Sequence, residues 1–197
     1  MSHLLDIRRR LERNGPTRAR DLQDWGAKPE QLRRWVENGE LVRLARGIYS
    51  VPNYQSGEHQ SLIEACLRSR HGVICLVSAL SFHGVTSQNP SEVWLALPQG
   101  SRTPHWREIG LRVVHLSAKF HMADVETHDL PDGTVRVYSL VRTLVEAFKF
   151  RGIVGLDVVF EAIRESVRTK RVTWDEIHLA AKARGVAGSI RPYLEAL

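Results

Sequence analysis

The sequence predicts an α+β protein in which an N-terminal winged helix-turn-helix domain precedes a small mixed β-sheet domain with a helical C-terminal half. Helical segments separated by glycines over residues 3–38, then a hairpin pattern over 41–51, predict the first domain. Short apolar runs between 73 and 138 and helical apolar spacing after Ser139 predict the second. The expected divisions are a winged-helix domain at 1–52, a linker at 53–57 and an α/β domain at 58–197.

The composition is that of a globular protein with a packed core. Of the 197 residues, 43% are apolar and 25% are charged, which excludes a disordered tail or a disulfide miniprotein. No stretch approaches the roughly 18 consecutive apolar residues that a membrane span needs, and the N-terminus lacks the apolar core of a signal peptide. We therefore expect a cytoplasmic protein with no membrane partner, whose Cys66 and Cys75 are reduced and buried.

Glycines and helical spacing place the first two helices. Apolar residues recur at helical spacing over 3–13, and Asn14-Gly15-Pro16 ends this helix. Thr17 is expected to be the N-cap of a second helix over residues 18–25, which Gly26 ends.

The third helix begins at Pro29, a residue favoured at the first helical position, and runs to about Asn38. Leu32, Trp35 and Val36 form its buried stripe. Two short helices joined by a tight glycine-containing turn are typical of a helix-turn-helix.

A hairpin follows directly. The β-like runs 41–44 and 48–51 flank Ala45-Arg46-Gly47, which we interpret as a three-residue turn with glycine in the left-handed conformation. A helix, a helix-turn-helix and a hairpin, in that order, are the elements of a winged helix.

Positive charge is concentrated in this first domain. The formal net charge is +6, and residues 1–52 hold 11 Lys and Arg against 7 Asp and Glu. A basic surplus on one small module indicates a polyanionic partner, most commonly nucleic acid, although an arginine-rich solvated face fits the same count.

The third helix is the expected recognition helix. Gln31 and Arg34 lie one turn apart and are candidates for base contact, since glutamine can pair with adenine and arginine with guanine. Lys28 and Arg33 are expected to bind phosphate. The remaining candidates for DNA contact are Arg43 and Arg46 on the wing, and Thr17 and Arg18 at the start of the second helix, where a phosphate fits.

The larger domain has the pattern of a mixed sheet followed by helices. Residues 58–70 are predicted to be helical, Ser78 is expected to cap a helix ending at His83-Gly84, and Thr173 with Glu176 forms a capping box. Strands are expected over 73–77, 92–97, 111–116, 125–130 and 134–138.

Sequence signatures of catalysis are missing from the larger domain. The spacings of the nine histidines and two cysteines fit no zinc signature, and neither a G-x-S-x-G elbow nor a phosphate-binding glycine loop occurs. His83, before a helix-ending glycine, is expected to bond carbonyls rather than to catalyse. We expect a non-enzymatic protein without metal or cofactor.

The larger domain has one cluster of positive charge. It comprises Arg164, Arg168, Lys170 and Arg171, at the end of a helix and in the loop after it. These cations can complement the helix dipole, or they can form a second surface for a polyanion such as flanking DNA or an RNA.

Four stretches, in order, resemble one family. They are "GAKPEQLRRWVENGELVRLARGIYSVP", "VSALSFHGVTSQNPSEVWLALPQGSRTP", "VRVYSLVRTLVEAFKFRGIVGLDVVFEAIRESV" and "RPYLEAL". Together they resemble the AbiE-type (AbiEi) antitoxins of type IV toxin–antitoxin systems. The resemblance implies a winged-helix repressor that binds inverted repeats in the operator of its own operon. It also implies that the larger domain counteracts a nucleotidyltransferase toxin, without forming a stable complex with it.

Two other function classes stay open. The winged helix could dock a protein partner rather than DNA, or it could target an enzyme to nucleic acid. Because the sequence has no heptad seam, we expect a monomer or weak dimer that pairs on double-stranded DNA.

Overall fold

The computed structural model describes residues 2–55, 57–106 and 109–194 and divides them into two compact units. The N-terminal unit comprises the chain up to Arg70 together with residues 128–135. The larger unit comprises residues 71–127 and the chain from Arg136 onward. The boundary between the two units therefore falls after Arg70, whereas the linker predicted from the sequence is at 53–57.

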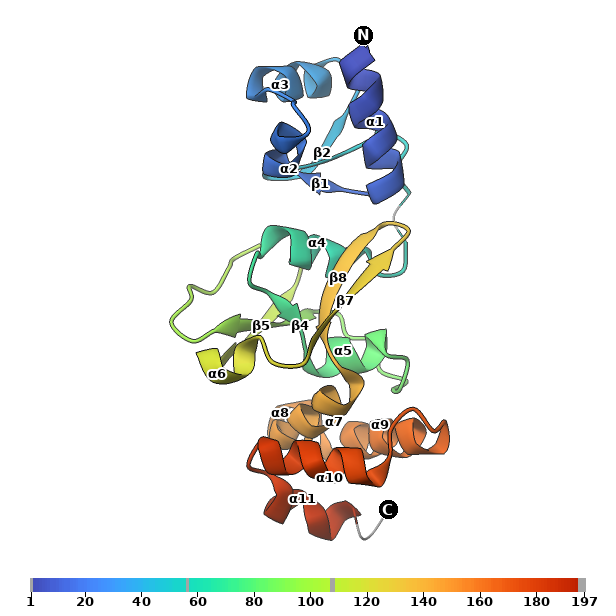
Figure 1. Ribbon diagram of the computed structural model, residues 1–197, viewed down its shortest axis with the longest axis vertical. Helices are drawn as coiled ribbons and strands as arrows, with labels where there is room; N and C mark the ends of the chain where they lie inside the picture. Colours follow the sequence, from blue (N-terminus) through green and yellow to red (C-terminus); the bar gives the residue numbers. More distant parts are fainter. Residues whose placement is uncertain (1, 56, 107–108, 195–197) are drawn as a thin grey trace. The chain divides into compact units, whose positions relative to one another are not determined.

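The N-terminal unit is a winged helix, as predicted (Figure 1). Its antiparallel sheet has the strand order β1-β3-β2. The elements are α1 (Ser2–Asn14), β1 (Thr17–Arg18), α2 (Ala19–Asp24), α3 (Pro29–Glu37), β2 (Val42–Ala45), β3 (Ile48–Ser50) and α4 (Gln60–Arg68).

The helices α1, α2 and α3 contribute to one apolar core. Ile7 and Leu11 of α1 are fully buried, and they pack with Leu22 of α2 and with Leu32 and Trp35 of α3. The apolar spacing in the sequence therefore identified the buried faces correctly. Burying side chains of this size stabilises a domain by roughly 1.5–3 kcal/mol each relative to exposing them.

The strand β1 was not predicted from the sequence. Thr17 and Arg18 pair with Tyr49 and Ile48 of β3, so the expected helical N-cap at Thr17 is wrong. The helix α2 starts one residue later than expected, at Ala19. A two-residue strand forms through long-range pairing, which local propensity does not reveal.

The hairpin turn is shorter than predicted. Ala45 pairs with Ile48, so Arg46 and Gly47 alone make the turn, and the register shifts between Arg43 and Ala45. The three-residue turn was therefore wrong, although Gly47 has the predicted left-handed backbone with φ +76°. The bulge takes up the extra residue.

The larger unit contains a mixed sheet with the strand order β6-β5-β4-β8-β7. The pairs β5–β6 and β4–β8 are parallel and the pair β4–β5 is antiparallel, which confirms the predicted mixed sheet. The strands of this sheet are β4 (Val73–Ile74), β5 (Val93–Pro98), β6 (Leu111–Leu116), β7 (Val125–Leu130) and β8 (Gly133–Tyr138). Residues 128–130 of β7 and 133–135 of β8 are part of the N-terminal unit.

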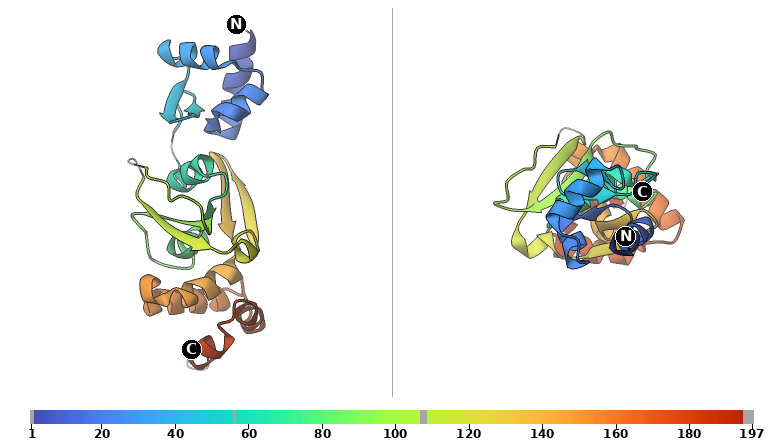
Figure 2. Two further views of the ribbon diagram at one scale, coloured as in Figure 1. Left: turned by 90° about the vertical axis from the view of Figure 1, so that its left-hand side faces the viewer. Right: turned by 90° about the horizontal axis from the view of Figure 1, so that it is seen from above.

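Helices make up the C-terminal half of this unit, as predicted. Figures 1 and 2 show the helices of residues 140–194 gathered together. Buried side chains of these helices share a core with β4, β5 and β8. The helices are α5 (Leu76–Phe82), α6 (Ala118–His121), α7 (Leu140–Lys149), α8 (Arg151–Val154), α9 (Leu156–Arg168), α10 (Trp174–Ala183) and α11 (Ala187–Leu194).

Two capping predictions in this unit had different outcomes. Thr173 and Glu176 form the predicted capping box at the start of α10. Ser78 does not cap α5, because β4 ends at Ile74 and the helix already begins at Leu76. The Ser78 hydroxyl instead accepts a hydrogen bond from the Trp94 backbone N–H at 2.9 Å. The side chain therefore connects α5 to β5.

Candidate nucleic-acid interface

The exposed face of α3 is set by how the helix starts and by what it buries. Pro29 occupies the first turn, and the Gln31 side chain accepts a hydrogen bond from the Lys28 backbone N–H at 2.9 Å. This bond satisfies one of the amides that a helix leaves free at its N-terminus. With Leu32 and Trp35 in the core, the charged residues of the helix face solvent.

The cations of α3 differ in their partners. Arg33 forms an exposed ion pair with Glu37, with 3.0 Å between Nε and Oε1. Arg34 is exposed and makes no ion pair or hydrogen bond through its side chain with any residue that the structure describes. Because it is already solvated and unpaired, Arg34 can contact a ligand without breaking an internal bond.

The wing presents two further arginines. Arg46 is exposed at the tip of the β2–β3 turn. Arg43 is also exposed, and its Nε donates a long hydrogen bond of 3.4 Å to the Ala45 carbonyl within the same strand. A wing of this kind can place positive charge along a phosphate backbone.

Thr17 is placed differently from the expected phosphate site. Its side chain is buried, and its hydroxyl donates to the Gly15 carbonyl at 3.1 Å. The first amide of α2, that of Ala19, donates to the Gly47 carbonyl at 2.8 Å. The Thr17 hydroxyl and the first amide of α2 were expected to bind a phosphate, but both donate to carbonyls inside the unit.

Arg18 is occupied as well. Its Nε donates to the Leu67 carbonyl at 2.5 Å and its Nη2 donates to the Cys66 carbonyl at 2.8 Å. These carbonyls belong to the last turn of α4, where backbone oxygens lack helical partners and carry partial negative charge. Arg18 thus fastens α4 to β1. Its sequence neighbourhood gave no signal of this, since the partners lie 48 and 49 residues away.

Residues 128–135 complete the N-terminal unit. Asp132 lies so close to Gly15 that a Cβ atom there would be 2.1 Å from the Asp132 carbonyl oxygen. Tyr54 donates to Gln60, and its burial together with the Asp132 carboxylate raises its pKa to about 12. The closeness of Asp132 to Gly15 and Tyr54 was not predicted from the sequence.

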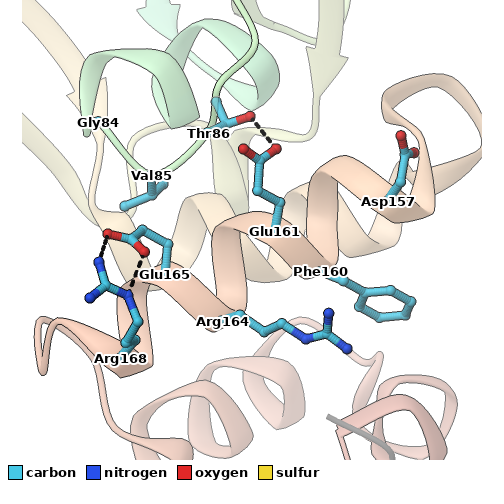
Figure 3. Close-up of a pocket in the computed structure, with 9 residues that line it drawn as sticks. All are labelled: Gly84, Val85, Thr86, Asp157, Phe160, Glu161, Arg164, Glu165 and Arg168. Carbon is cyan, nitrogen blue, oxygen red and sulfur yellow. Dashed lines mark hydrogen bonds and ion pairs between the residues drawn. The ribbon is translucent and has the colours of Figure 1, made fainter.

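Arg164 and Arg168, two of the four residues of the predicted second basic surface, line a groove of mixed charge in the larger unit. The groove, of about 680 Å³, lies between α9 and residues 84–86 and is lined by Asp157, Phe160, Glu161, Arg164, Glu165 and Arg168 (Figure 3). Hydrogen bonds from the Ser87 backbone and the Thr86 hydroxyl lower the pKa of Glu161.

Two of the four predicted cations on this surface are engaged. Arg168 makes two hydrogen bonds to Glu165, at 2.7 and 2.9 Å (Figure 3). Arg171 donates to the His83 carbonyl. Lys170 lies in the turn after α9, and Arg164 is exposed. The four residues do not form a uniformly basic face, and a polyanion partner for them stays a prediction.

A buried ionic network, missed by the sequence analysis, lies in the larger unit. Arg142 stacks on the Tyr138 ring, donates to Glu146 through Nε and Nη2, and donates to the Ala123 carbonyl. Arg184 bonds to Asp124 at 2.8 Å. Arg142, Glu146 and Arg184 are all buried. The Arg184 Nη1 also lies 3.7 Å from the Glu146 Oε1, so the network joins α7 to the end of α10.

Two histidines of the larger unit, His83 and His121, are buried. The His83 Nε2 donates to the Tyr138 carbonyl at 2.8 Å, so it bonds a carbonyl as predicted, but one at the end of β8 rather than in its own helix. Burial lowers the pKa of His121, and the Arg142 guanidinium adds to this effect.

Metal-binding clusters and membrane-spanning helices are both missing from the part of the chain that the structure describes. Within residues 2–55, 57–106 and 109–194, no group of three or more His, Cys, Asp or Glu side chains is placed to hold a metal ion. No helix in the same residues is long and apolar enough to cross a membrane.

The fold and its exposed arginines define a winged helix-turn-helix protein with a larger α+β domain. Residues 6–52 match the family described as "Transcriptional regulator, AbiEi antitoxin". The match covers the winged helix, where it agrees with the resemblance to the AbiEi antitoxins, and it supports a DNA-binding regulator of the antitoxin type. Comparison with curated proteins gave no match.

A solved structure supports the fold over most of the chain. It is described as "Crystal structure of RV2827C protein from Mycobacterium tuberculosis", with 15% sequence identity and a TM-score of 0.58. The similarity covers 91% of this chain and 69% of that one. At this identity the likeness establishes the fold alone.

Proposed function

We propose that the protein is the antitoxin of a type IV toxin–antitoxin system and represses its own operon by sequence-specific binding to operator DNA. The observation that supports this best is the unpaired Arg34 on the exposed face of α3, within the domain that matches the AbiEi regulators. A cation presented in this way can reach base edges in the major groove.

The two parts of the surface have separate roles in this proposal. The helix α3 enters the major groove, where Arg34 contacts a base while Lys28 and Arg33 contact phosphates. Arg43 and Arg46 of the wing lie along the backbone. We leave Thr17 and Arg18 out of the direct contacts, because their side chains are bonded within the unit.

The role of the larger unit rests on the family resemblance. We propose that it counteracts a nucleotidyltransferase toxin without enzymatic activity of its own and without a stable complex. Two copies of the chain, monomeric or weakly dimeric when free, pair on the inverted repeats of the operator.

A protein-docking winged helix is the second candidate. It is favoured by the exposed acidic residues Glu30 and Glu37 on α3, which give the helix a mixed charge. Such a module should form a complex with its partner that survives high salt in gel filtration, whereas phosphate contacts are weakened by salt.

The test is a fluorescence-anisotropy titration of the full chain against its own upstream DNA and a scrambled duplex, at two salt concentrations. We expect at least about a tenfold preference for the native duplex, or about 1.4 kcal/mol. Arg34→Ala should relax this preference. Arg46→Ala should weaken both duplexes equally and reduce the salt slope by about 0.9.

The matched control is Lys182→Ala, which removes one exposed cation from α10 in the larger unit. It should change neither affinity nor preference. Equal binding of the two duplexes by the unaltered chain would refute a sequence-specific repressor and leave the protein-docking candidate.

A further inference from the structure

The hydrogen bond at the start of α3 limits what Gln31 can offer to DNA. The Gln31 Oε1 accepts from the Lys28 backbone N–H at 2.9 Å. An amide N–H requires an acceptor, so this contact also decides which end of the Gln31 amide faces the helix terminus. The Nε2 group, at the other end of the amide, is left to contact a ligand.

This arrangement is at odds with the adenine contact expected from the sequence. Adenine in the major groove presents a donor at N6 beside an acceptor at N7, and glutamine pairs with both through its oxygen and its nitrogen. In this chain the oxygen already accepts the hydrogen bond from the Lys28 backbone N–H. Contacting adenine in that way would leave the Lys28 amide without its partner.

A guanine edge fits the remaining donors better. Guanine presents two acceptors, N7 and O6, side by side in the major groove. The Gln31 Nε2 supplies two N–H groups and no acceptor. Arg34, one turn further along α3, also supplies only donors and is unpaired among the described residues.

The neighbouring acid is compatible with the same base pair. Glu30 is exposed in the first turn of α3 and lies four residues before Arg34, hence on the same helix face. A carboxylate accepts from the N4 amino group of cytosine, the partner of guanine. The acceptor and the donors on this face therefore match the two bases of a G·C pair.

We propose that the Gln31 side chain, held by the Lys28 amide, contacts guanine, and that α3 selects a half-site containing G·C pairs. This inference rests on the proposed function, because it specifies the DNA that the recognition helix binds. Gln31 acts as a specificity-determining residue with the carbonyl end of its amide committed to the helix cap.

The substitution Gln31→Glu separates the two uses of the side chain. Glutamate is a preferred capping-box residue at this position, and its charge is favourable at a helix N-terminus, so α3 should stay folded. The same substitution replaces the Nε2 donors by an acceptor. Gln23→Glu makes the identical chemical change at an exposed position of α2 and controls for the added negative charge.

The experiment is a selection of bound duplexes from a randomised 20-base-pair library by the full chain and by each variant. The unaltered chain should select guanine at a position where Gln31→Glu does not, with a preference of about tenfold. Gln23→Glu should keep the selected pattern while lowering overall affinity. Replacing that guanine by 7-deazaguanine, which lacks the N7 acceptor, should weaken binding of the unaltered chain and leave Gln31→Glu unaffected.

Each other outcome overturns a specific statement. Adenine at the position that depends on Gln31, or an identical pattern with Gln31→Glu, would refute the guanine contact while leaving the repressor intact. If the unaltered chain selects no sequence at all, the proposed function fails and this inference fails with it.

Discussion

The two arginine-rich regions of the chain differ in what their charges contact. On α3 and the wing, Arg34 and Arg46 are exposed, and Arg34 is unpaired within the described part of the chain. On and after α9, Arg168 is bonded to Glu165, and Arg171 to a backbone carbonyl. Similar clusters of basic residues in the sequence therefore have different capacities to bind an anion.

The difference teaches that counting charges is not sufficient to locate a polyanion surface. A paired guanidinium must give up its internal partner before it can bind phosphate, whereas a solvated one need not. Buried pairs such as Arg142–Glu146 are the extreme case, because they contribute to packing and are inaccessible to a ligand.

The largest effect is expected from Arg142→Ala. It leaves Glu146 buried without its closest partner, which typically costs about 3–5 kcal/mol. Urea denaturation should show this loss, and Lys149→Ala on the exposed side of the same helix should change stability far less. A stability equal to that of the unaltered chain would mean that the network is not a structural core of the larger unit.

Arg18→Ala should have an intermediate effect. It removes two charged hydrogen bonds to the last turn of α4 and should destabilise the N-terminal unit by about 1–3 kcal/mol. Thermal unfolding and anisotropy should be measured together, with the exposed Arg20→Ala as the control. If stability is unchanged and operator affinity falls, Arg18 contacts DNA after all and belongs with the α3 surface.

A smaller effect is expected from pH, through His121 in the larger unit. Because burial lowers the pKa of His121 in the folded chain, the unfolded chain binds more protons below about pH 6.5. Stability should therefore be fully present above that pH and fall as the pH decreases. Melting temperatures between pH 8 and 5 should show this, and His121→Gln should flatten the curve. Parallel curves for the two proteins would rule out this contribution.

The smallest effect is expected from Arg168→Ala. Arg168 is exposed and its partner Glu165 is half-buried, so solvent screens much of the ion pair. Neither stability nor affinity for the upstream duplex should change measurably. A lower affinity with a smaller salt slope would instead identify α9 as a second DNA-binding surface and remove the difference between the two regions.

Much of the fold could be predicted because its signals are local. Pro29, the Thr173–Glu176 capping box and the apolar spacing of Ile7 and Leu11 each act within a few residues, and the structure agrees with all three. The missed features depend on distant partners. The strand at Thr17 requires β3, and the role of Ser78 requires the Trp94 amide.

The sequence by itself determined the winged helix, the mixed sheet and the set of basic residues, since helix periodicity, caps and composition are properties of short segments. Only the tertiary structure decided which of those residues are available. Arg18 and Arg34 look alike in the sequence, yet the first is bonded to α4 and the second is exposed. The physical reason is that the availability of a charge depends on the groups that folding brings within hydrogen-bond distance of it.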